Sequence, residues 1–272
     1  MGIGCGAVGV TGARIIDSPR ERLIAIITNS FMPCNGRLPA IIALITMFFT
    51  DSSLLGAAIL TGTVVFSVLI TLFVSKILSK TVLKGIPASF TLELPPYRIP
   101  KFGKVIVRSL FDRTLKILGR AVLVAVPAGI LIWLCSNFSI NGKTVLTIIS
   151  GFFDNFAKIF GLDGNILCGF ILSFPANEIA LPIMAMGYSG GTLSELGNLS
   201  ETALLFIENG FSFGTAICTV IFFLFHWPCA TTIVTIWKET KSIKWTLFSV
   251  FIPLITGLSL CFLINIVSKL FF

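Results

Sequence analysis

Two Pro-Cys pairs interrupt long apolar segments of this 272-residue chain, Pro33-Cys34 and Pro228-Cys229. A proline inside a helix removes a hydrogen bond and clashes with the preceding turn, at a cost of about 3 kcal/mol. Within a lipid bilayer, the backbone groups freed in this way must bond to protein or face a water-filled cavity. Each break also carries a thiol, which is a good ligand for soft and borderline metals. The pattern therefore predicts a pathway for a metal ion.

Polar residues beside the two breaks extend this candidate site. Arg37 follows Cys34 and Gly36, and an arginine at membrane depth is costly, so it usually faces a cavity or a partner. We expect Arg37 either to bind the carbonyls freed at its own break or to balance the charge of a cation path. His226, the only histidine, precedes the second break; it is either a metal ligand, since imidazole with thiolate suits Fe(II), Zn(II) or copper, or simply hydrogen-bonded. Hydroxyls that follow Pro228 are expected to satisfy the carbonyls it frees: Thr231, Thr232 and Thr235.

A third apolar segment is interrupted at Phe174-Pro175-Ala176-Asn177-Glu178. Glu178 is the only acid between Asp163 and Glu195, and a carboxylate inside a membrane marks a functional site by default. We interpret it as a residue that handles a metal or a proton, with structural pairing, for example with Arg37, as the alternative. Asn177 offers a neutral oxygen ligand beside it.

Composition predicts the fold class. The chain is 55% hydrophobic and 12% charged, whereas soluble domains carry about 25% charged residues. Uncharged runs at 54–74, 209–237 and 245–268 each reach the roughly 20 residues that span a bilayer. We predict an all-α, polytopic membrane bundle with broken and re-entrant helices, forming a single domain over residues 1–272. Its membrane segments are expected at 23–50 (broken), 54–75, 120–138, 164–187 (broken), 211–237 (broken) and 245–268.

The basic residues indicate the orientation in the membrane. Residues 76–120 hold ten basic and two acidic residues, a surplus equal to the net charge of +8 of the whole chain. The positive-inside rule therefore predicts a cytoplasmic loop at 76–119, with an interfacial amphipathic helix at 105–119. No aromatic interleaving accompanies the charges, so we expect no nucleic-acid partner. Segment 164–187 either spans the membrane or forms a re-entrant hairpin, and the hairpin fits the charge rule better.

The chain shows no motif of a known enzyme class. Asn141-Gly142-Lys143-Thr144 resembles the end of a P-loop but lacks the first glycine, and HExxH and GxSxG are absent. Seven scattered cysteines form no CxxC pair, so most are expected to be small buried hydrophobic residues. We expect a protein that is not an enzyme. The alternatives to a metal path are a transporter of another solute, such as another divalent metal or a nucleoside, a non-transporting partner subunit and, less favoured, a membrane thiol oxidoreductase.

Several motifs in order resemble the permease portion of the ferrous iron transport protein B (FeoB) family, and the resemblance covers essentially the whole chain. They are Gly4-Cys5, Ala13-Arg14, Arg20-Glu21-Arg22-Leu23, Phe31-Met32-Pro33-Cys34, Arg37-Leu38-Pro39, Leu92-Glu93-Leu94-Pro95-Pro96-Tyr97, Phe174-Pro175-Ala176-Asn177-Glu178, Pro228-Cys229-Ala230, and Lys238-Glu239-Thr240 with Lys244-Trp245. The resemblance implies a multi-pass importer of Fe2+ in the prokaryotic cytoplasmic (inner) membrane, with Gate repeats and cysteines matching Cys34 and Cys229 along the ion path.

The resemblance also implies cofactors and partners. No cofactor is expected to be bound permanently: Fe2+ is the transported ion, and GTP and Mg2+ belong to the family's N-terminal G domain. That domain and the first Gate repeat have no counterpart in this sequence, so we expect no GTP hydrolysis by this chain. Expected partners are the lipid bilayer, the missing part or a split-gene counterpart, a small FeoA-like accessory protein and further copies of the chain. The expected metal ligands are Cys34, Cys229, Glu178, His226 and Asn177, shaped by helix breaks at Pro33, Gly36, Arg37, Pro175 and Pro228.

Overall fold

The computed structural model describes residues 2–49, 52–83, 103, 107, 111, 115–140, 143–189 and 199–271. These residues are mainly helical, which confirms the predicted all-α fold class. The helices are α1 (Gly6–Gly12), η1 (Ala13–Ile15), α2 (Pro19–Thr28), η2 (Asn29–Phe31), α3 (Leu38–Phe48), α4 (Ser53–Lys80), α6 (Lys116–Asn137), α7 (Val145–Ile159), α8 (Gly164–Leu172), η4 (Asn177–Ile179), α9 (Ala180–Tyr188), α10 (Leu199–Glu208), α11 (Phe213–Phe225), α12 (Ala230–Thr240) and α13 (Ile243–Phe271). A two-residue antiparallel pair, β1 (Ser139–Ile140) and β2 (Lys143–Thr144), joins α6 to α7.

Three stretches of the described residues are long and apolar enough to cross a membrane: Ser53–Lys80, Phe213–Thr240 and Ile243–Lys269. The second runs through α11 and α12 across the Pro228 break. Helices α7 and α8 reach the same hydropathy together but bend by 111° between them. Only 11% of the most apolar window of α4 is buried, so most of its surface is available to lipid. The chain is a multi-pass membrane protein.

Helices occupy all six predicted membrane segments within the described residues. The first is broken as expected, because α2 and η2 end before Pro33 and α3 starts at Leu38. Most of the predicted basic loop at 76–119 and of its amphipathic helix at 105–119 lies outside the described residues. The sequence reasoning assigned no membrane element to 145–159, where α7 forms.

Helices α8 and α9 form a hairpin, which is the arrangement favoured for segment 164–187. They pack along each other, and the first and last turns meet because the Tyr188 hydroxyl donates a hydrogen bond to the Asp163 carboxylate. Asp163 also caps α8 by accepting a hydrogen bond from the Ile166 amide at 2.8 Å. Residues 173–179 are therefore the tip of the hairpin, far from both of its ends.

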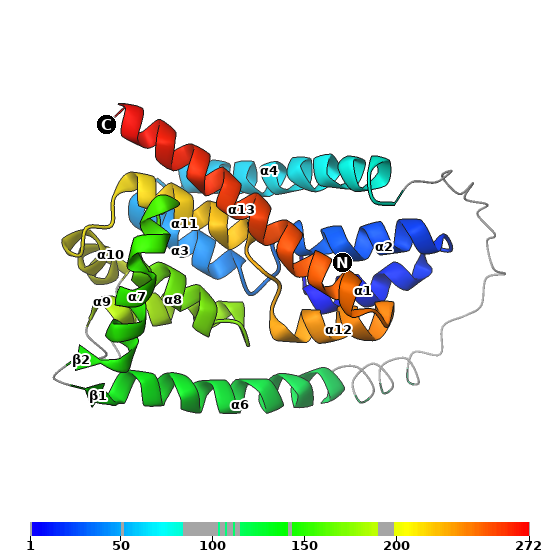
Figure 1. Ribbon diagram of the computed structural model, residues 1–272, viewed down its shortest axis with the longest axis horizontal. Helices are drawn as coiled ribbons and strands as arrows, with labels where there is room; N and C mark the ends of the chain where they lie inside the picture. Colours follow the sequence, from blue (N-terminus) through cyan, green and yellow to red (C-terminus); the bar gives the residue numbers. More distant parts are fainter. Residues whose placement is uncertain are drawn as a thin grey trace.

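The molecule has two contrasting ends, which Figure 1 shows at opposite sides of the view. The basic end gathers α1, α2, α12 and the C-terminal end of α4, with lysines and arginines that include Arg20, Lys80 and Lys238. There the Arg20 guanidinium ties α2 to α4 by donating to the Ser79 carbonyl at 3.1 Å. The hairpin end holds β1, β2, α10 and the C-terminus. Between the ends lies an apolar core rich in phenylalanine: Phe31, Phe170, Phe222, Phe223 and Phe225 are fully buried.

Candidate functional site

The three predicted helix breaks meet in the interior of the fold. The Ala230 amide donates a hydrogen bond to the Phe174 carbonyl at 2.9 Å, which joins the hairpin tip to the Pro228 break. The Glu178 side chain lies against Gly36, which joins the tip to the Pro33 break. Residues 30–37, 173–179 and 224–230 together form the break junction. Segments that are distant in the sequence therefore contribute to one site.

Arg37 holds the break junction together. Its side chain is buried, with the residue only 2% exposed. One terminal nitrogen donates to the carbonyls of Ser30 at 3.1 Å and Leu224 at 2.8 Å, and the other to those of His226 at 3.1 Å and Trp227 at 3.0 Å. Arg37 thus binds freed backbone carbonyls, which is one of its two expected roles. However, only one of these carbonyls belongs to its own break at Pro33, and the other three belong to the break at Pro228. A proline-broken helix exposes acceptors that a planar guanidinium can satisfy together.

The two Pro-Cys thiols flank this arginine. Cys34 and Cys229 are both half-buried, and both lie within electrostatic range of the Arg37 guanidinium. Cys229 is the N-cap residue of α12, and its sulfur lies 3.1 Å from the Thr231 hydroxyl and 3.2 Å from that of Thr232. The expectation for the threonines is therefore wrong in detail. Thr231 and Thr232 contact the thiol, Thr235 bonds within α12 to the Thr231 carbonyl, and Arg37 takes the freed carbonyls instead.

Glu178 reaches the first break from the hairpin tip. A methyl group placed on Gly36 would stand 3.1 Å from Cγ and 3.3 Å from Oε1 of Glu178, so the absence of a side chain at Gly36 is what allows the carboxylate to approach. Glu178 itself is exposed. Among the described residues it forms no ion pair with Arg37, whose terminal nitrogens all donate to backbone carbonyls. The carboxylate remains available to a ligand.

His226 is fully buried beside the second break. Its Nδ1 lies 3.1 Å from the Phe222 carbonyl and 3.0 Å from that of Phe223. Because carbonyls only accept, Nδ1 must carry the proton, and Nε2 then holds a lone pair. No described residue bonds to Nε2, and the rings of Phe170, Phe222, Phe223 and Trp227 surround the imidazole. Of the two alternatives for His226, hydrogen bonding therefore applies to Nδ1, while Nε2 is still able to act as a ligand.

Unpartnered polar atoms concentrate at the break junction. Six buried side-chain polar atoms of the described residues have no hydrogen-bond partner, and five of them belong to the break junction: Ser30 Oγ, Arg37 Nε, Asn177 Oδ1, His226 Nε2 and Trp227 Nε1. Buried polar groups are normally satisfied by protein, water or an ion. Both donors and acceptors are represented among these five atoms. The sequence did not predict Ser30 and Trp227 as site residues. Their only distinguishing feature in the sequence is that they lie close to a proline break.

The described residues do not form a compact metal cage. No group of three or more His, Cys, Asp or Glu side chains among them is placed to hold a metal ion. The structure does bring Cys34, Cys229, Glu178, Asn177 and His226 to one junction. Whether these residues ligate a metal stays a prediction.

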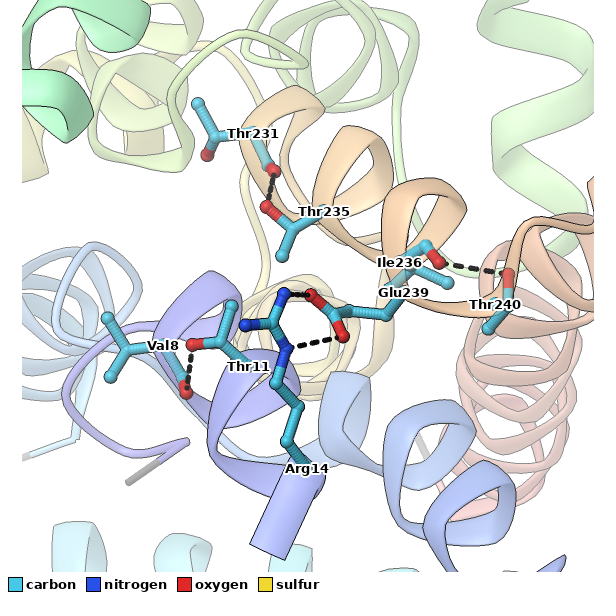
Figure 2. Close-up of polar contacts among 8 residues, drawn as sticks. All are labelled: Val8, Thr11, Arg14, Thr231, Thr235, Ile236, Glu239 and Thr240. Atoms are coloured by element: carbon cyan, nitrogen blue, oxygen red, sulfur yellow. Dashed lines mark hydrogen bonds and ion pairs between the residues drawn. The ribbon is translucent and has the colours of Figure 1, made fainter. Parts of the chain in front are cut away.

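The N-terminal segment covers the break junction toward the basic end. The backbone amide of Asn35 donates a hydrogen bond to the Gly4 carbonyl at 3.2 Å. The side-chain amide of Asn29 donates to the Gly6 carbonyl at 2.9 Å. Figure 2 shows Arg14 reaching from η1 to Glu239 of α12 in a two-bonded ion pair with distances of 2.8 and 2.5 Å. Sequence reasoning did not predict this contact, because 225 residues separate the partners.

Fold and site together define a helical membrane protein whose broken helices converge on a polar interior. A model for the ferrous iron transport protein B C terminus matches residues 60–112, and a Gate model described as nucleoside recognition matches residues 118–243. Proteins named Fe(2+) transporter FeoB are similar over nearly the whole chain. That of Staphylococcus aureus (strain COL) is 32% identical over 100% of this chain and 40% of its own length.

Two further relatives extend the similarity. The Synechocystis protein of the same name is 27% identical over 94% of this chain and 41% of its own length, and that of Leptospira interrogans (serovar copenhageni) is 24% identical over 98% and 42%. The chain belongs to the FeoB family and corresponds to its C-terminal portion. It spans about two fifths of the length of these curated relatives. No solved structure matches it.

Proposed function

We propose that this chain forms the membrane path of an Fe2+ importer and that the ion crosses at the break junction. The observation that carries the proposal is the gathering of three helix breaks, with two thiols, a carboxylate and five unpartnered polar atoms, inside an apolar bundle. Polar groups are costly at membrane depth and are retained where an ion or water passes. The relatives are named Fe(2+) transporters, which supports ferrous iron as the cargo.

The ligands would act in sequence. Glu178 is exposed beside Gly36. Its carboxylate can replace a water ligand of an arriving cation. Cys34 and Cys229 flank Arg37, and their sulfur atoms suit a borderline ion such as Fe2+ better than Mg2+ or Ca2+. His226 Nε2 and Asn177 Oδ1 add neutral ligands. Transport requires that each site bind weakly enough to release, so a succession of incomplete sites serves better than a closed cage.

Arg37 keeps this path open in the proposed mechanism. Its four carbonyl hydrogen bonds fix the two Pro-Cys breaks relative to each other. Its charge also discourages a cation from resting permanently between the thiols, because like charges repel strongly in a medium of low dielectric. Arg37 is therefore a positioning residue that shapes the path rather than a metal ligand.

The basic end faces the cytoplasm in this proposal, as the positive-inside rule requires. Iron would then enter at the hairpin end and leave beneath α1. We infer that the protein resides in the cytoplasmic (inner) membrane of a prokaryote. The chain spans 40% of its relative's length. We infer that GTP and Mg2+ bind to segments outside this chain. A FeoA-like protein or further copies of the chain would also act through those segments.

Uptake of radioactive Fe(II) by cells producing the chain tests the proposal. We expect accumulation above that of cells with an empty vector, and its loss in Cys34→Ser/Cys229→Ser. Mn(II), Zn(II) and a labelled nucleoside are the competing substrates to assay. Accumulation at the vector level, or full accumulation in the double variant, would contradict the proposed path.

A further inference from the structure

A second pair of thiols lies away from the break junction, where α11 packs against α13. Cys218 and Cys261 are almost completely buried, at 1% and 0% exposure. The Cys261 thiol donates to the Cys218 carbonyl at 3.3 Å, and the Cys218 thiol donates to the Cys261 carbonyl at 3.7 Å. The two side chains also interact with each other. The proposed iron path uses neither residue.

A cavity at the hairpin end lies near this pair. It encloses about 580 Å³, and its lining includes Asp154, Asp163, Tyr188 and Gly161. Gly161 has a φ of +70°, the left-handed region that favours glycine. A methyl group placed on it would stand 3.0 Å from the Cys218 sulfur. Gly161 therefore lies both on the wall of the cavity and against the Cys218 thiol.

We propose that Cys218 and Cys261 form a binding site for a thiophilic divalent cation that accepts two sulfur ligands, of the class of Hg(II). Soft thiolates select such ions. With a divalent cation, two S–H bonds break, two sulfur–metal bonds form and two protons leave toward the cavity. The product is electrically neutral, which matters because an unpaired charge in an apolar interior is very costly.

The same geometry disfavours the proposed cargo. Borderline ions take more ligands, with Zn(II) commonly four-coordinate. Around this pair the described residues supply no third His, Cys, Asp or Glu that could complete a metal site. The pair is thus a site for soft ions that lies beside the route of a borderline one, and it stands whether or not the chain carries iron.

The test is a titration of the purified chain with Hg(II) chloride. In a variant that keeps only Cys218 and Cys261, we expect one Hg(II) per chain, loss of both thiols to a thiol reagent and sulfur-to-mercury charge-transfer absorbance. The matched control keeps Cys168 and Cys261, which preserves two buried thiols but removes their contact. We expect the control to bind at least about tenfold more weakly, a difference of about 1.4 kcal/mol.

Folding of the multiple variants is checked by circular dichroism. If they fail to fold, Cys218→Ala in the otherwise unchanged chain gives the second measurement, and it should remove one tightly bound Hg(II) and leave Cys261 unprotected. Equal affinity in the matched control, one Hg(II) for each thiol, or no change in Cys218→Ala would overturn the proposal.

Discussion

The two thiol pairs of this molecule lie in opposite environments. Cys34 and Cys229 stand at the ends of broken helices, half-buried, beside a buried arginine and several unpartnered polar atoms. Cys218 and Cys261 lie within intact helices, almost completely buried, and each thiol bonds to the carbonyl of the other residue. Of these two pairs, the thiols at the helix breaks are therefore the more accessible ones.

The largest expected effect comes from removing the residue that organises the first environment. Arg37→Met would leave the carbonyls of Ser30, Leu224, His226 and Trp227 without their donor. We expect a loss of about 3 kcal/mol or more in unfolding free energy, because buried groups left unpaired are strongly destabilising. Thermal unfolding in lipid nanodiscs measures the loss.

Two variants sharpen this prediction. Arg37→Lys keeps the charge but not the planar fork, so its stability should fall between those of the wild type and Arg37→Met. Arg22→Met, on α2 at the basic end, controls for the loss of one arginine and should change stability much less. Equal stability of Arg37→Met and the wild type would show that the breaks are held by other contacts.

Thiol labelling tests the comparison itself. A water-soluble maleimide should modify Cys34 and Cys229 much faster than Cys218 and Cys261, since exposure controls the reactivity of otherwise ordinary thiols. Mass spectrometry of digested protein gives the rate at each site. Fe(II) added under anaerobic conditions should protect the first pair only. Equal rates at the four cysteines would remove the distinction between the two environments.

A smaller effect is expected at the contact between the hairpin tip and the first break. In Gly36→Ala the new methyl group would press on Glu178 at 3.1 Å, so the carboxylate must move. We expect the affinity for Fe(II) to fall roughly three- to tenfold, which corresponds to about 1 kcal/mol. Gly62→Ala on α4 is the matched control, because nothing lies within 4 Å of the methyl position there. A similar affinity in both variants would exclude Glu178 from the binding step.

Much of this arrangement could be predicted from the sequence. Proline breaks in apolar runs identified all three segments of the break junction, although proline alone does not decide a break, because Pro127 and Pro253 lie inside the continuous helices α6 and α13. The pairing of Arg37 with the carbonyls of Leu224 and Trp227 could not be predicted, because their separation in sequence hides it. Helix α7 was missed because Asp154 and Lys158 interrupt its apolar pattern, although these two residues pair with each other.

The smallest expected effect lies at the surface of the basic end. The Arg14 side chain is 68% exposed and that of Glu239 is 12% exposed, and an ion pair with a solvent-exposed partner contributes at most about 1 kcal/mol. A double-mutant cycle of Arg14→Ala and Glu239→Ala should give a coupling energy within that limit, and it should decrease with added salt. A coupling above it would mean that the contact in Figure 2 holds η1 firmly on α12.

The pH dependence of this ion pair has a definite sign. The hydrogen bond and charge of Glu239 raise the pKa of Arg14 above its usual value. A raised pKa of a basic group stabilises the folded state below the unfolded pKa, and the contribution is lost only as the pH rises through the folded value. The coupling energy should therefore stay constant from neutral to mildly alkaline pH.

Anaerobic Fe(II) binding to the purified chain tests most directly whether the break junction is the ion site. Equilibrium dialysis would compare the wild type with Cys34→Ser/Cys229→Ser and, as a matched loss of two thiols, Cys218→Ser/Cys261→Ser. We predict that the first double variant loses Fe(II) binding and that the second retains it. Binding retained in the first variant, or lost equally in both, would contradict an iron path through the break junction.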